Sequence, residues 1–176
     1  LVVDARNEYG GSDRTALALY GLDLVVEPYR ETSLSVEFAD PASAVASGDD
    51  PRFYWHLAMS NHDGSVIEGV DPELDGEYGK EVLVTLRGPG NVYRLTVRYN
   101  TEEGTEVERA ETPASVSLLV TCKYVRRELR KLTDQDLEDF LFAMSVFYEL
   151  AEPDASLKYG PDFVTYKFIT AVHNSQ

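Results

Sequence analysis

The chain has 176 residues, of which 31 are acidic and 16 are basic, so its formal net charge at neutral pH is −15. A chain of this length folds as one or two domains and is long enough to bury a hydrophobic core. The negative charge argues against a nucleic-acid partner, because phosphate binding requires clustered Lys and Arg side chains. No uninterrupted apolar run reaches the roughly 18 residues of a membrane span, so no span is expected.

Cys122 is the single cysteine, which excludes an internal disulfide framework and any multi-cysteine zinc site. We expect it to be a small buried hydrophobic residue rather than a reactive thiol. The sequence begins at Leu1, and no basic segment followed by an apolar stretch comes after it. The chain is therefore expected to be a processed product or a fragment.

Residues 1–122 are expected to form a β domain, because apolar and polar side chains alternate in short runs bounded by turn residues. About seven strands at this spacing are typical of a sandwich of two antiparallel sheets. Residues 1–21 are harder to assign, and their last part, 15–20, is compatible with an edge strand or a short helix. The runs that predict strands are 22–29, 33–38, 53–59, 65–67, 81–86, 92–99 and 116–121.

Trp55 is the only tryptophan and lies in the third of these strands, where an immunoglobulin-like core places its central aromatic residue. The turn Asp63-Gly64 follows, and Gly88-Pro-Gly90 leads into Tyr93-Arg-Leu-Thr-Val97. This stretch resembles the polycystic-kidney-disease (PKD) branch of immunoglobulin-like domains. The missing cysteine pair excludes the antibody type, and the resemblance implies a spacer or adhesion module over residues 1–122.

From residue 123 onward the hydrophobic period becomes helical, and 123–176 are expected to form a second, all-α part. A basic segment, 124–131, precedes Thr133, which is expected to cap a helix that has Asp136 at its third position. The helix is expected to end at Glu152-Pro153-Asp154. An apolar stripe follows its cap at helical spacing: Leu137, Phe140, Leu141, Met144, Phe147 and Tyr148.

A second helix is expected over residues 163–173, after a turn at Tyr159-Gly160 and with Pro161-Asp162 in its first helical turn. The two helices carry more apolar surface than they can hide from each other. Burying one large apolar side chain is worth about 1.5–3 kcal/mol. Residues 124–176 are therefore expected to pack against the sandwich, the remainder of the same polypeptide or another protein chain.

Three features of the β half could be binding sites, but a purely structural interpretation is expected for each. Carboxylates alternate along Asp71-Pro-Glu73-Leu-Asp75-Gly-Glu77, but the position of a bidentate calcium ligand holds Val82, so an exposed loop is expected. His56 neighbours Trp55 on a strand and is expected on the opposite, surface or half-buried, side. His62 is expected to be a turn residue. From its position alone, His173 would be a cation at a helix end.

Residues 124–176 resemble the start of the tyrosinase family of type-3 copper proteins. The matching pieces are Val125-Arg-Arg-Glu-Leu-Arg-Lys-Leu-Thr-Asp-Gln-Asp136, the amphipathic helix over 137–150, and Tyr166-Lys-Phe-Ile-Thr-Ala-Val-His-Asn174. The resemblance implies that His173 is the first histidine ligand of the first copper. It also implies the start of a four-helix bundle whose two coppers use dioxygen to oxidise phenols or catechols.

The family's other five histidine ligands have no counterpart in this sequence. The resemblance therefore implies copper in the full-length protein and none in this fragment alone, which is not catalytically complete. It also implies a secreted or luminal location. The alternative is a non-catalytic structural or interaction module, whose sandwich and helical tail pack within a larger assembly.

Overall fold

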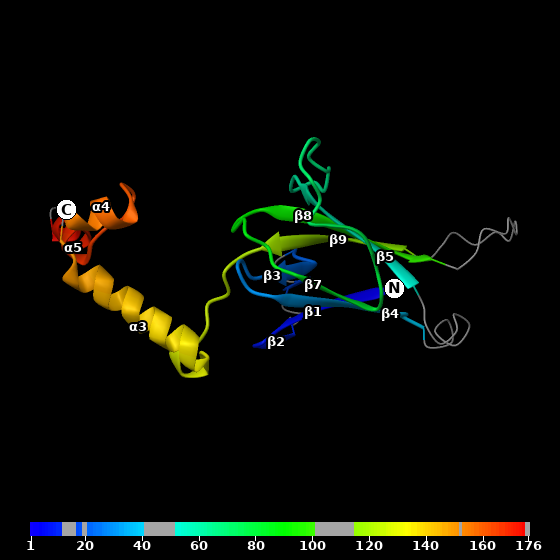
Figure 1. Cartoon of the computed structure of the whole chain (residues 1–176), viewed down its shortest axis with the longest axis horizontal. Coiled ribbons are helices and arrows are strands. Elements are labelled where there is room, and N and C mark those ends of the chain that lie inside the picture. The colour runs from blue at the N-terminus through cyan, green and yellow to red at the C-terminus, as the bar shows by residue number, and fades with distance from the viewer. Residues whose placement is uncertain (12–16, 19–20, 41–51, 101–114, 152, 175–176) are drawn as a thin grey trace, which may run out of the picture. The chain divides into compact units, whose positions relative to one another are not determined.

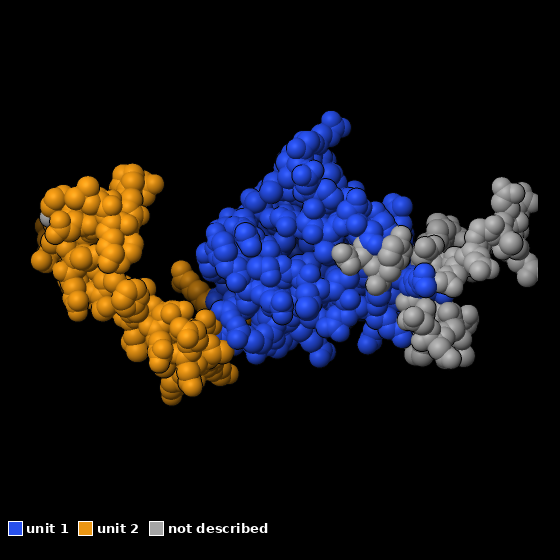
Figure 2. All heavy atoms as spheres, viewed as in Figure 1, with its two compact units in different colours: residues 1–125 blue, residues 126–176 orange. Residues whose placement is uncertain are grey.

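The computed structural model describes residues 1–11, 17–18, 21–40, 52–100, 115–151 and 153–174. The chain divides into two compact units, Leu1–Val125 and Arg126–Gln176, coloured blue and orange in Figure 2. Unit 1 is built of strands and unit 2 of helices (Figure 1). Most of segment 15–20, expected as an edge strand or a short helix, lies outside the described residues.

Unit 1 contains two β-sheets. Among the described residues, one sheet has the strand order β2-β1-β4-β7, and the other has the order β3-β9-β8-β5-β6. The β3–β9 pair is parallel, and the other strand pairs are antiparallel. The strands are β1 (Val2–Asn7), β2 (Gly10–Gly11), β3 (Leu24–Val26), β4 (Thr32–Glu37), β5 (Arg52–Ser60), β6 (Leu74–Tyr78), β7 (Glu81–Val84), β8 (Val92–Asn100) and β9 (Ser115–Cys122).

One core joins the inner faces of the two sheets, which gives unit 1 a sandwich-like fold. Successive side chains of a strand point to opposite faces, so the alternating sequence runs bury every second residue. Phe53, Trp55 and Leu57 of β5 are buried, and the Trp55 indole N–H donates to the Gly79 carbonyl at 2.9 Å. The first sheet contributes Val3, Ala5, Leu34, Val36, Val82 and Val84 to the same core.

The structure confirms strands within six of the predicted runs and corrects the assignment at three places. Residues 65–67 form only an isolated bridge, Ser60 to Val66, and no strand. Within 1–21, residues 2–7 form strand β1. Residues 74–78 of the acidic stretch form strand β6 rather than a loop, because they pair with the edge of β5. Glycine and acidic residues are uncommon in strands, so they predict a loop even where, as here, they form an edge strand whose outer side faces solvent.

The turn after β5 is built around Gly64. Asp63 Oδ1 accepts hydrogen bonds from the Ser65 hydroxyl at 2.7 Å and from its backbone N–H at 2.8 Å. These bonds hold the pKa of Asp63 below its ordinary value. Gly64 is buried with φ +83°, and a Cβ added there would lie 2.6 Å from Arg94 Nη2. Only glycine meets both conditions without strain.

The Gly64→Ala variant is therefore expected to lower the free energy of unfolding of unit 1 by about 1–3 kcal/mol. Gly69→Ala is the matched control, because Gly69 has a similar φ of +78° and open space around its Cβ position. Urea unfolding followed by the fluorescence of Trp55 measures both variants. Equal losses of stability in the two variants would show that the short distance between the added Cβ and Arg94 does not contribute to the destabilisation.

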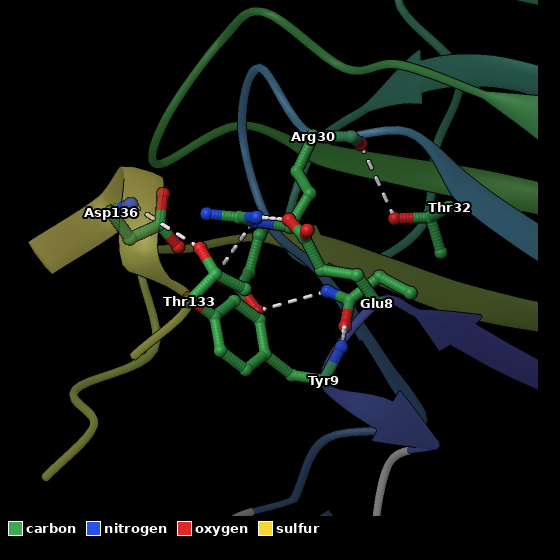
Figure 3. Close-up of polar contacts among 8 residues, drawn as sticks. Glu8, Tyr9, Arg30, Thr32, Thr133 and Asp136 are labelled. Atoms are coloured by element: carbon green, nitrogen blue, oxygen red, sulfur yellow. Dashed lines mark hydrogen bonds and ion pairs between the residues drawn. The ribbon is translucent and has the colours of Figure 1, made fainter. Parts of the chain in front are cut away.

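Unit 2 consists of helical segments: η1 (Leu129–Lys131), α3 (Asp134–Glu149), α4 (Asp154–Tyr159) and α5 (Tyr166–Asn174). Thr133 Oγ1 accepts a hydrogen bond from Asp136 N at 3.2 Å, so the predicted cap of α3 is confirmed (Figure 3). Helix α3 ends before Pro153, as predicted. The short helix α4 was not predicted, and Gly160, with φ 97°, follows its last residue.

The start of the last helix differs from the prediction. Pro161 and Asp162 lie in a turn, and α5 begins at Tyr166. The buried Thr165 provides the reason, because its hydroxyl oxygen accepts a hydrogen bond from Phe168 N at 3.3 Å and acts as the helix cap. Proline and aspartate suit a first helical turn, but they suit the turn before a cap equally well.

Candidate functional site

His173 lies in the last turn of α5, and its side chain is exposed. Residues three, four and seven apart share one face of a helix, so Tyr166, Ile169, Thr170 and His173 form one stripe. The Tyr166 hydroxyphenyl ring packs against α3, with ring centroids 4.6 Å from Tyr148 and 6.1 Å from Phe147. The imidazole thus lies two turns beyond Tyr166 on the same stripe, and both Ile169 and His173 are exposed there.

The apolar surface around this stripe is not covered within unit 2. Helix α5 also exposes Phe168, Ile169 and Val172. Helix α3 exposes apolar side chains on more than one side, since Phe142, 65% exposed, lies opposite the half-buried Leu137 and Met144. A helix that is apolar around much of its circumference is typical of the interior of a bundle.

The other histidines and the cysteine lie where the sequence predicted. His56 is half-buried on β5, on the face opposite the buried Trp55, and His62 is exposed in a turn. Cys122 is a free and buried thiol, and its burial raises its pKa above the ordinary value. A thiol that resists ionisation is a poor nucleophile and metal ligand, so its role is packing.

Residues 74–78 of the acidic stretch lie in strand β6. Asp71 and Glu73 are exposed, and Asp75 on β6 accepts a hydrogen bond from the Tyr54 hydroxyl. Among the residues that the structure describes, no three His, Cys, Asp or Glu side chains gather so that they could hold a metal ion. His173 is thus one imidazole without further described ligands beside it.

A polar cluster in unit 1 was not predicted (Figure 3). Glu27 is only 7% exposed and accepts a hydrogen bond from Asn7 Nδ2 at 3.0 Å. Arg30 Nε lies 3.7 Å from Glu27 Oε2, and the same guanidinium pairs with Glu8 and lies over the Tyr9 ring, 4.9 Å from its centroid. A buried carboxylate is tolerated only with such partners, so the cluster is structural. No local pattern joins Asn7 to Glu27, since 20 positions separate them.

Comparisons with family models, with curated proteins and with solved structures found no match to this chain. None of the helices in the described part of the chain combines the length and the apolar composition needed to cross a membrane.

Proposed function

We propose that this chain is the N-terminal part of a tyrosinase-like type-3 copper protein, in which an immunoglobulin-like domain precedes the copper-binding bundle. The observation that carries the proposal is the exposed imidazole of His173, two turns along α5 from Tyr166, whose ring packs against Tyr148 of α3. A capped helix comes before it, in the order that the resemblance requires.

The strand arrangement supports the immunoglobulin-like part of the proposal. The neighbours β5-β8-β9 correspond to the C-F-G sheet of such domains, and β4-β7 correspond to the B-E pair of the other sheet. Trp55 lies in the core on the C-equivalent strand. Tyr93 is buried near the start of β8, where such domains place their corner tyrosine. Burial raises its pKa, and its side chain bonds to the side chain of Asn91, whereas a corner tyrosine bonds to the backbone.

The histidines of this chain determine how much of a copper site it can supply. Imidazole suits both Cu(I) and Cu(II), so His173 is a chemically suitable ligand. His56 and His62 lie in unit 1 and have no place in the resemblance, so His173 is the one ligand that it assigns among the described residues, whereas a pair of coppers in the tyrosinase family takes six. The proposal therefore places the other five ligands in a longer polypeptide. The metals would supply the oxidation of phenols or catechols with dioxygen, and this chain's contribution is one ligand and the helices that position it.

The uncovered apolar faces of α3 and α5 support a further part of the same proposal. We assign their covering to the remainder of the polypeptide, whose helices would complete the bundle. Leu141, Phe142 and Ile169 are exposed at their present positions, and burying each would stabilise the assembly by about 1.5–3 kcal/mol. The expected location of the protein is secreted or luminal.

Copper loading of the natural polypeptide tests the proposal. The polypeptide that continues past Gln176 is expected to bind two coppers, to develop a near-ultraviolet absorption band when oxygen is admitted, and to oxidise a simple catechol. The 176-residue chain is the matched control and should do none of these. A natural chain without further histidine-rich helices, or one that binds no copper, would contradict the proposal.

The second candidate is a non-catalytic structural or interaction module. The same exposed apolar faces favour it, because they would equally suit a separate protein chain. In that case the natural polypeptide would lack copper and oxygen-dependent absorbance, and the helical unit would co-purify with its partner. Copper content of the natural protein separates the two candidates.

A further inference from the structure

The segment that spans the boundary between the two units is strongly basic. Within the sequence of an acidic chain, residues 123–131 hold five basic side chains against the single acid Glu128. We call this segment the basic connection. It begins where β9 ends and finishes just before the cap of α3. Its basic residues are Lys123, Arg126, Arg127, Arg130 and Lys131.

The first part of the basic connection has no regular secondary structure. Lys123 N–H still donates to the Val26 carbonyl at 3.0 Å, but residues 123–128 belong to no helix or strand. Tyr124 is 68% exposed, Val125 and Arg126 are exposed, and Arg127 is half-buried. Glu128 has extended backbone angles, φ −66° and ψ 133°. Proteins that bind peptides by strand addition require an extended backbone, and residues 123–128 could adopt one without loss of a helix or strand, because they belong to neither.

The second part of the basic connection is folded. Arg130 and Lys131 lie in η1, where Lys131 N–H donates to the Glu128 carbonyl at 2.8 Å and Leu132 N–H donates to the Leu129 carbonyl at 3.3 Å. Arg130 also pairs with Glu128. The basic pair Arg130-Lys131 would therefore have to unwind before it could bind to a protease as a strand. Arg126-Arg127 and Arg130-Lys131 thus carry the same charge but differ in backbone conformation.

We propose that Arg126-Arg127 is a processing site for a serine endoprotease specific for paired basic residues. One water molecule adds across the Arg127–Glu128 amide bond, which leaves a carboxylate on Arg127 and an amino group on Glu128. Acidic binding pockets of such a protease complement the basic connection, whereas the rest of the chain, with its excess of acidic residues, repels them. The bond lies two residues past the boundary between the two compact units, so the cut leaves unit 1 whole and removes only Arg126 and Arg127 from unit 2.

Limited proteolysis of the whole chain tests the site. Trypsin cleaves after any basic residue, and its first cut, located by intact-mass spectrometry, is expected after Arg126 or Arg127. Because cleavage follows the population of accessible backbone, the variant Lys123→Gln/Arg126→Gln/Arg127→Gln, which removes every basic residue of the first part, should survive about tenfold longer. The matched control, Arg130→Gln/Lys131→Gln, should stay within about twofold of the unmodified chain. Slower cleavage of both variants alike, or a first cut elsewhere, would overturn the proposal.

Two further measurements test the specificity and the products. A paired-basic endoprotease should cut the unmodified chain and fail on the single variant Arg126→Gln, which trypsin still cuts after Arg127. After cleavage, unit 1 should keep the fluorescence of its buried Trp55 and an unchanged midpoint of urea unfolding. Cleavage of Arg126→Gln by the paired-basic enzyme would refute the site, and loss of the Trp55 signal would refute the release of a folded unit.

Discussion

Under the proposed copper function, replacing His173 with alanine in the longer polypeptide is expected to abolish the oxygen-dependent absorbance and the oxidation of catechol. The imidazole would be a direct ligand of one copper, and dioxygen chemistry in this family requires both metals. Removing a side chain that only orients a metal ligand lowers metal affinity by about 10–100-fold, so removing the ligand itself should lower the affinity by more. Copper content, absorbance and turnover are measured together.

The control for this variant is His62→Ala. His62 is exposed in a turn of unit 1, so its removal should change neither copper content nor absorbance. Because His173 is also exposed, His173→Ala should leave the unfolding of the 176-residue chain unchanged. Full copper occupancy in the His173→Ala polypeptide would remove the ligand assignment.

Replacing Trp55 with alanine is expected to have the largest effect on the stability of unit 1, about 3–5 kcal/mol. The indole is fully buried between the sheets, and its N–H donates to the Gly79 carbonyl. Truncation would leave a large cavity and would also leave that carbonyl without its donor. Trp55→Phe keeps most of the apolar volume and should cost less, with the lost hydrogen bond contributing about 1 kcal/mol.

The measurement should report on unit 1 alone, because a chain of two units need not unfold in one step. Native-state hydrogen exchange of the amides in β5 and β8 provides such a readout. Leu83→Ala on β7 is the control, since that side chain is 59% exposed and its loss should stay within about 0.5 kcal/mol. Similar effects of Trp55→Ala and Leu83→Ala would contradict the central position of the indole.

Period-2 patterning predicted the central strands because each has one buried face. Buried and less buried residues alternate from Phe53 to Leu57 and from Tyr93 to Val97, and both strands lie in the interior of their sheet. Strand β6 escaped prediction because Asp75 and Gly76 are typical of turns, and what makes them a strand is pairing with β5. That pairing joins distant residues and leaves no local signal.

The helical unit illustrates the same limit. The cap of α3 was predictable, because Thr133 and Asp136 are three residues apart and their hydrogen bond is local. The start of α5 was not, because Pro161 and Thr165 both suit a helix start and only the structure decides between them. The face that His173 occupies was likewise visible only once the Tyr166–Tyr148 contact was known.

The parallel pair β3–β9 has a mechanical consequence. Leu24, Val25 and Val26 are matched to Val120, Thr121 and Cys122, and the chain leaves the sheet directly after this ladder. Tension between the beginning of β3 and the end of β9 acts along the strands and across their hydrogen bonds. The backbone hydrogen bonds between β3 and β9 are then loaded in shear, so they must break together rather than one after another. Force applied between these two points therefore meets more resistance than force that would open the same hydrogen bonds one at a time.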